Sequence, residues 1–141
     1  MKEISKNIEN NFKKGIPVYE CVQKAESLIK KNGTCLFLFD VKNSKKYSTE
    51  DRQKLQYQLK NMITEMNIEF DEYFPKNNLA TETREEKGFY SLFGDSSWAG
   101  INNSEIIPKM VDFIYQKCPE FSFHFNIARD GYDQEAMKTV K

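Results

Sequence analysis

Apolar residues recur every three or four positions in three stretches of the chain, as they do on the buried face of a helix. This pattern predicts helices over residues 3–31, 49–70 and 103–117. Gly15 and Pro17 divide the first stretch into two pieces, because glycine and proline interrupt a helix and proline suits a first turn. The chain should therefore begin with two N-terminal helices and carry two more further on.

Four shorter stretches have the character of strands. Two of them are continuous apolar runs bounded by turn residues, which is typical of strands buried in the centre of a sheet. The last one alternates phenylalanine with polar residues, the period of two that a strand with one buried face requires. The predicted strands cover residues 34–41, 88–93, 97–101 and 121–128.

The polar segments between these elements predict turns and one long loop. Ser48 and Asp51 have the spacing of a capping box, with aspartate in place of glutamate, and mark the start of a helix. Gly94-Asp95 is a short hairpin signal between the second and third strands. Residues 71–87 are mostly polar and predict a long loop or a short, poorly fixed element, and loops of this length are usually mobile or functional.

With the N-terminal helices set aside, the order of elements is β-α-β-β-α-β, the pattern of a ferredoxin-like fold. We expect an α+β domain over residues 34–131: a four-stranded antiparallel sheet with helices on one face, in which strand one lies beside strand three. Residues 1–33 form a helical segment before it and 132–141 a tail. The apolar face of the N-terminal helices should pack on the open side of the sheet or against a second copy, which would make a homodimer.

The charge and composition of the chain limit the kinds of partner that it can bind. Lysine plus arginine and aspartate plus glutamate are both 21, so the net charge is zero and no overall field attracts nucleic acid or an anionic membrane. The apolar runs are about eight residues long, too short to cross a bilayer, and the first residues lack the apolar core of a signal peptide. Three widely spaced cysteines without a zinc-binding pattern suggest reduced thiols in a cytoplasmic protein.

Two acidic residues stand at the ends of buried apolar runs. Asp40 closes the run of the first strand, and Asp95 follows that of the second. A buried strand has little reason to carry an acid unless the acid is paired or holds a cation. In the expected sheet the two carboxylates would lie on neighbouring elements and form a divalent-metal site. The alternative is that both simply cap turns, where aspartate is a favoured residue.

Three segments of the chain resemble the palm domains of class III nucleotide cyclases and the related SatD and diguanylate cyclase families. Residues 39–44 (Phe-Asp-Val-Lys-Asn-Ser) are similar to the strand that ends in an aspartate and a short loop. Residues 94–100 (Gly-Asp-Ser-Ser-Trp-Ala-Gly) are similar to the Gly-Asp hairpin. Residues 123–131 loosely resemble a later strand of the family. The order and spacing of these segments carry the resemblance, which covers residues 34–131.

The resemblance implies a role for each matching residue. Asp40 and Asp95 would bridge two Mg²⁺ ions, and the carbonyl of Val41 would complete one coordination shell, since Mg²⁺ prefers oxygen ligands. Two such metals can bind a nucleoside triphosphate, activate a hydroxyl and stabilise departing pyrophosphate. The phosphates would contact the backbone N–H groups of the loop and the hairpin glycine. The residues implied in nucleotide binding are Lys42, Asn43, Ser44 and Gly94.

The sequence also departs from these families. The lysine that reads the base in the cyclases has no counterpart before Gly94, and serine follows Asp95 where diguanylate cyclases have glutamate. The asparagine and arginine that stabilise the cyclase transition state lie beyond the last matched strand. These departures favour a degenerate palm domain that binds a ligand over a complete cyclase. A non-catalytic ferredoxin-like domain that binds a ligand or another protein is the alternative.

Two further residues have structural and functional interpretations. His124 is the only histidine, and on an alternating strand it suits a polar surface or edge position better than a catalytic base. Trp98 suits a core or platform position beside the hairpin, with base stacking as the lesser alternative.

Overall fold

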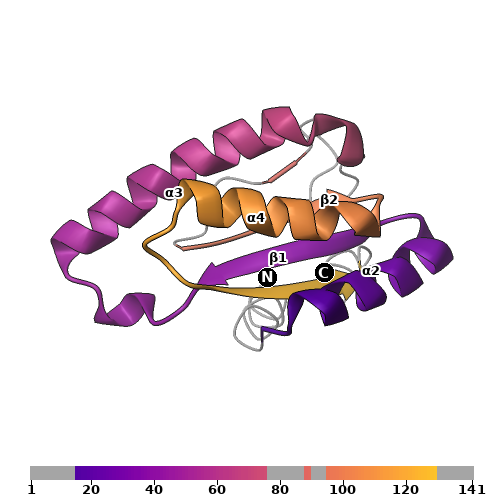
Figure 1. Ribbon diagram of the computed structural model, residues 1–141, viewed down its shortest axis with the longest axis horizontal. Coiled ribbons are helices and arrows are strands. Elements are labelled where there is room, and N and C mark those ends of the chain that lie inside the picture. The colour runs from indigo at the N-terminus through magenta and orange to yellow at the C-terminus, as the bar shows by residue number, and fades with distance from the viewer. Residues whose placement is uncertain (1–14, 76–87, 90–94, 130–141) are drawn as a thin grey trace, which may run out of the picture.

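The computed structural model describes residues 15–75, 88–89 and 95–129. Figure 1 shows their arrangement, and its labels are used below. Three short 3₁₀ turns, η1, η2 and η3, lie at Ser44–Lys46, Asp71–Tyr73 and Ser104–Ile106. The longer elements are, in order, α2 (Val18–Asn32), β1 (Cys35–Val41), α3 (Thr49–Glu69), β2 (Ser96–Ile101), α4 (Ile107–Lys117) and β3 (Phe123–Arg129).

The strands form one antiparallel sheet in the order β2-β1-β3, with β1 in the centre. Cys35 lies opposite Ile101 on one side and Arg129 on the other, and Asp40 lies opposite Ser96 and His124. The prediction that strand one lies beside strand three is therefore confirmed, since β2 is the predicted third strand. The central position of β1 explains its continuous apolar sequence, because both of its faces are buried.

The prediction of a four-stranded ferredoxin-like sheet is wrong, because the described residues form three strands. The predicted second strand begins at Gly88 and Phe89, which are not in a strand, and its residues 90–93 lie outside the described ranges. Phe89 instead donates its N–H to Asn67 Oδ1 at 2.7 Å and accepts from Asn67 Nδ2 at 3.2 Å. Gly88 has φ +90° and lies so close to Asn67 that a Cβ would be 2.4 Å from Oδ1. A side-chain amide of α3 thus takes the backbone bonds that a neighbouring strand would have made.

The core lies between the sheet and the helices. Residues 35, 37, 39 and 41 of β1 face this core, and helices α2, α3 and α4 cover it on one side of the sheet (Figure 1). The rings of Phe37 and Phe125 stack at 5.8 Å, and Phe89 contacts both Phe37 and Phe39. Phe89 is thus a core residue even though its backbone is not part of the sheet.

Of the two predicted N-terminal helices the described residues contain one, and the prediction that it packs on the open side of the sheet is wrong. Among the described residues one helix, α2, precedes β1, and the predicted first piece lies outside them. Its buried residues Cys21 and Ala25 belong to the same core as α3 and α4, so α2 does not cover the open side of the sheet. Because α2, α3 and α4 all lie on one face of the sheet, no described helix lies on the opposite face.

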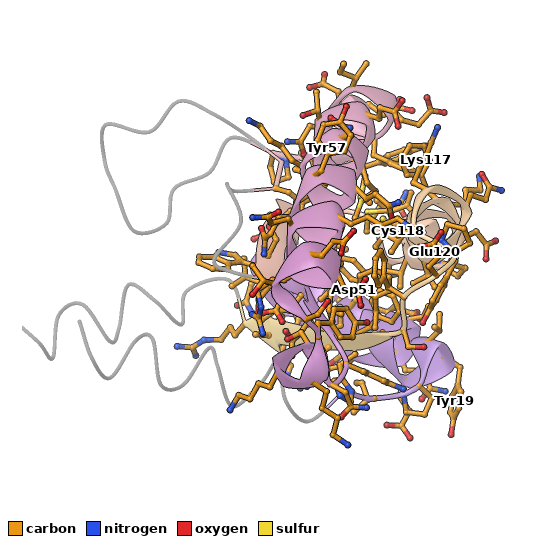
Figure 2. The ribbon with its side chains drawn as sticks, turned by 90° about the vertical axis from the view of Figure 1, so that its left-hand side faces the viewer. Tyr19, Asp51, Tyr57, Lys117, Cys118 and Glu120 are labelled. Atoms are coloured by element: carbon orange, nitrogen blue, oxygen red, sulfur yellow. The ribbon has the colours of Figure 1, made fainter. Side chains whose placement is uncertain are left out.

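Helices α3 and α4 begin and end largely as their sequences predict. The Ser48 hydroxyl accepts the N–H of Asp51 at 3.1 Å, which confirms the predicted cap of α3. Figure 2 shows Lys117 and Glu120 beside α3, where Lys117 pairs with Glu65 at 3.2 Å and Glu120 with Lys54 at 2.9 Å. All four side chains are substantially exposed, so apolar packing rather than these ion pairs holds the two helices together.

Candidate functional site

The two predicted acids come together at one end of the sheet. Asp40 is the next-to-last residue of β1, and Asp95 immediately precedes β2. The N–H of Val41 donates to the carbonyl of Asp95 at 3.2 Å, which fixes the two chain segments side by side. The sequence prediction that Asp40 and Asp95 lie on neighbouring elements is therefore confirmed at the level of the backbone.

Asp40 belongs to the face of the sheet that the helices do not cover. Its side chain accepts a hydrogen bond from the Ser96 hydroxyl at 2.9 Å. Its cross-strand neighbour on the other side is His124. Burial and the positive charge of Lys42 both lower the pKa of His124, so its neutral form is favoured. Ser96, Asp40 and His124 thus form a polar row across the three strands.

Asp95, just before β2, lies at the same strand end and meets the loop that leads from β1 to α3. Its Oδ2 accepts a hydrogen bond from the hydroxyl of Ser44, which is buried. Burial raises the pKa of Asp95, and a hydrogen bond from its own backbone N–H and the charges of Arg52 and Lys45 oppose this effect. Repulsion from Asp40 would also raise the pKa of Asp95. The leading cause of the raised pKa, however, is removal of the Asp95 carboxylate from water.

The loop after β1 is held by its own hydrogen bonds. Lys42 donates its N–H to the carbonyl of Ser122 at 2.8 Å, and Arg52 Nη2 donates to the carbonyl of Ser44 at 2.9 Å. Asn43 has the left-handed φ of +57° that lets the chain turn into η1. The expected phosphate contact through the Lys42 N–H does not fit this arrangement, because the fold already uses that group. Gly94 lies outside the described residues.

Few side chains at this end can ligate a metal. In the described part of the chain no group of three or more histidine, cysteine, aspartate and glutamate side chains converges. Asp40 and Asp95 would therefore supply two carboxylates, with water, ligand oxygens and backbone carbonyls such as that of Val41 completing a shell. This donor set suits Mg²⁺, which retains several waters and often binds through one or two carboxylates plus phosphates.

Three further residues, Arg52, Ser96 and Lys45, complete the surroundings of the two acids. Arg52 lies in the first turn of α3, one turn after the cap at Ser48, and this spacing turns it back toward Ser44. Ser96 directly follows Asp95 and is the register partner of Asp40. The charge of Lys45 acts on Asp95 from η1. The sequence signal for Arg52 is its position after the cap, whereas Ser96 requires the strand register.

Comparison of the chain with known protein families, with characterised proteins and with solved structures yields no match. Within the described residues, no helix has both the length and the apolar character that crossing a membrane requires.

Proposed function

We propose that this protein is a palm-type domain that binds a nucleoside triphosphate together with Mg²⁺ at the end of β1. The observation that carries the proposal is the hydrogen bond from Val41 N–H to the Asp95 carbonyl, which places Asp95 beside Asp40. Neighbouring carboxylates at a strand end provide the oxygen ligands that a hard divalent cation prefers. Asp40 bonds Ser96 and Asp95 bonds Ser44, so a shared cation would lie where β1 ends and β2 begins.

The charges around the strand end suit a metal–nucleotide complex better than a bare metal. Lys45 and Arg52 act on Asp95, and Lys42 acts on His124 beside Asp40. A triphosphate would bring negative charge to these cations while its Mg²⁺ met the two carboxylates. The Arg52 guanidinium is the best placed of them, because its hydrogen bond to Ser44 already holds it over the loop.

The proposed function is binding of a nucleoside triphosphate with Mg²⁺. If the domain is also catalytic, its chemistry is nucleotidyl transfer or a cyclase-type reaction. When bound, Mg²⁺ would polarise the phosphoryl oxygens and stabilise charge on a leaving pyrophosphate. Of the protein's own groups, Asp40 and Asp95 would position the cation, and Arg52 would orient the phosphates. His124 is a further candidate proton acceptor at this end, since its pKa is lowered and it lies opposite Asp40.

A second function is supported by the hydrogen bonds that the acids already make. Ser44 satisfies Asp95 and Ser96 satisfies Asp40, which is how purely structural aspartates are held at turns. The alternative function is therefore a non-catalytic domain that binds another protein or a metal-free ligand. In that case neither carboxylate would respond to Mg²⁺.

Titration of the protein with Mg²⁺·ATP and Mg²⁺·GTP, followed by thermal melting and calorimetry, tests the proposal. We expect the wild type to bind one of these complexes only when Mg²⁺ is present. Asp40→Asn and Asp95→Asn should each weaken binding at least tenfold, since each removes a charged ligand worth about 1.4 kcal/mol or more. Asp112→Asn, on an exposed residue of α4, is the matched control and should bind as the wild type does.

Two outcomes would count against this function. Absence of any Mg²⁺-dependent nucleotide binding by the wild type would leave the interaction domain as the remaining interpretation. Equal weakening by Asp112→Asn would show that the effect is one of overall charge. Incubation with ATP or GTP and chromatography of the products then separates a binding domain from an enzyme, because only an enzyme releases pyrophosphate.

A further inference from the structure

The link between α2 and β1 contains the only asparagine of the chain that is followed by glycine, Asn32-Gly33. Asn32 is the last residue of α2, and two residues, Gly33 and Thr34, connect it to Cys35 at the start of the central strand. Asn32 and Gly33 are both exposed. A Cβ added to Gly33 would meet no atom within 4 Å. Water therefore reaches this pair of residues, and no neighbouring side chain crowds Gly33.

An asparagine followed by glycine can react with its own backbone. The backbone nitrogen of Gly33 attacks Cγ of Asn32, so that a bond forms between these two atoms and the bond from Cγ to Nδ2 breaks. Nδ2 leaves as ammonia with the proton of the Gly33 nitrogen, and a cyclic succinimide remains. Water then opens the succinimide at one of its two carbonyls, which gives aspartate or isoaspartate. Glycine favours the attack because it has no side chain to obstruct it.

The folded end of α2 opposes this reaction. The N–H of Gly33 donates to the carbonyl of Ile29 at 2.7 Å, and Gly33 has the left-handed φ of +85° that is typical of a helix cap. A nitrogen whose proton is held in a hydrogen bond is a poor nucleophile. Side chains of a helix also tilt toward its N-terminus, whereas the Gly33 nitrogen lies on the C-terminal side of Asn32. The cap thus keeps the two reacting atoms apart.

We propose that Asn32 is a site of spontaneous deamidation and that the C-terminal cap of α2 controls the rate of this reaction. The last turn of a helix opens more easily than its interior, and here that turn is exposed to water. Each opening releases the N–H of Gly33 from Ile29 and lets the nitrogen approach Cγ of Asn32. The rate of deamidation therefore depends on how often this end of α2 opens.

The main consequence of the reaction is a longer backbone between α2 and β1. Isoaspartate passes the chain through its side-chain carbons and so adds one atom to a link of two residues. Both ends of this link are fixed, because α2 packs in the core through Cys21 and Ala25 and β1 pairs with a strand on each side. The new carboxylate is unfavourable at a helix C-terminus, but Lys30 and Lys31 in the last turn offset its charge.

The experiment incubates the full-length protein at mildly alkaline pH, in buffer and in guanidinium chloride, and locates the product by mass spectrometry. Cleavage after glutamate at mildly acidic pH yields peptide 27–50, which contains both Asn32 and Asn43. Asn43 is the internal control, because Ser44 follows it and a serine side chain obstructs the attack. Asn32→Gln is the matched variant, since it keeps an uncharged amide and should lose the reaction at this position.

We expect deamidation of Asn32 to be at least about fivefold faster in guanidinium chloride than in buffer, the factor that corresponds to loss of one protecting hydrogen bond. In the unfolded chain Asn32 should react faster than Asn43. Wild type that is aged in guanidinium chloride and then refolded should melt at a lower temperature than Asn32→Gln treated in the same way, because only the wild type carries isoaspartate in the link.

Three results would overturn the proposal. Equal rates at Asn32 in buffer and in guanidinium chloride would show that the cap of α2 does not control the reaction. A rate at Asn32 no higher than that at Asn43 in the unfolded chain would show that Asn32 is not a preferred site. Equal melting temperatures of the aged wild type and the aged Asn32→Gln variant would show that the longer link has no effect on the fold.

Discussion

The two faces of the sheet differ in what their residues do. The face under the helices is a continuous apolar core in which Phe37 and Phe39 contact other aromatic rings. The opposite face, which we call the outer face, buries Leu36 and Leu38 beside the polar Asn126 in its centre, and one end of it carries Ser96, Asp40 and His124. The first face stabilises the fold through burial, whereas the second presents polar groups beside the candidate metal site. Substitutions on the two faces should therefore differ in size and in kind.

The largest expected effect is on the helical face. Phe37→Ala should destabilise the protein by about 3–5 kcal/mol, because Phe37 is fully buried and loses its ring contacts with Phe89 and Phe125. Urea unfolding measures this loss directly. If the variant loses less free energy than Leu38→Ala on the outer face, then the outer face contributes more to stability than its composition indicates.

Asn67→Ala should cost about 1–3 kcal/mol, because it leaves the buried N–H and carbonyl of Phe89 without their side-chain partner. Asn67→Asp keeps one acceptor and should lose less. Chemical denaturation of both variants measures the difference. Equal stability of Asn67→Ala and the wild type would indicate that Phe89 finds other partners, for example a strand.

The two serines that bind the acids give a closer comparison. Ser44→Ala should cost about 1–3 kcal/mol, since Ser44 is buried and its partner Asp95 is half-buried. Ser96→Ala should cost about 0.5–1.5 kcal/mol, because Ser96 is less buried than Ser44. Thermal unfolding of the two variants decides the order. A larger loss for Ser96→Ala would show that the outer row is the more structural of the two.

The smallest expected effect is the change of folding stability with pH that the Asp95 carboxyl causes. Its pKa is raised in the folded protein above the ordinary value of 3.8, so folding favours the protonated carboxyl. This contribution is fully present below pH 3.8 and is lost as the pH rises through the raised pKa. Without metal, Asp95→Asn should therefore gain stability relative to the wild type as the pH increases through this window.

Unfolding of wild type and Asp95→Asn across that pH range, in the presence of a chelator, provides the test. A relative stability of the variant that falls with increasing pH would show that Arg52 and Lys45 outweigh the effect of burial. Saturating Mg²⁺ with a bound nucleotide should reverse the expected trend, since the cation favours the ionised carboxylate.

Local sequence predicted the helices and strands that depend on nearby residues. The cap at Ser48, the apolar period of residues 49–70 and the continuous apolar run of β1 each have a local physical cause, and the structure confirms them. Antiparallel pairing of β1 with β2 also followed from the order of elements. These features depend on backbone propensity and on the period of apolar residues, which a single sequence displays.

The number of strands and the placement of α2 depended on tertiary contacts. Phe89 is apolar and lies in a run that resembles a strand, but Asn67, 22 residues earlier, binds its backbone. Similarly, the apolar face of α2 required cover but did not specify which side of the sheet would provide it. An apolar pattern records that a residue is buried, and it does not identify the partner that buries it.

The sequence by itself determined that Asp40 and Asp95 end two apolar runs, and hence that both acids lie at the margin of the core. Only the tertiary structure decided their surroundings: Ser96 beside Asp40, and Ser44, Lys45 and Arg52 around Asp95. The physical reason is that hydrogen bonds and charge interactions act over a few ångströms in space. Ser44 and Asp95 are 51 positions apart in the sequence, and Asp40 and Ser96 are 56 positions apart. Each pair meets only after the strands have paired.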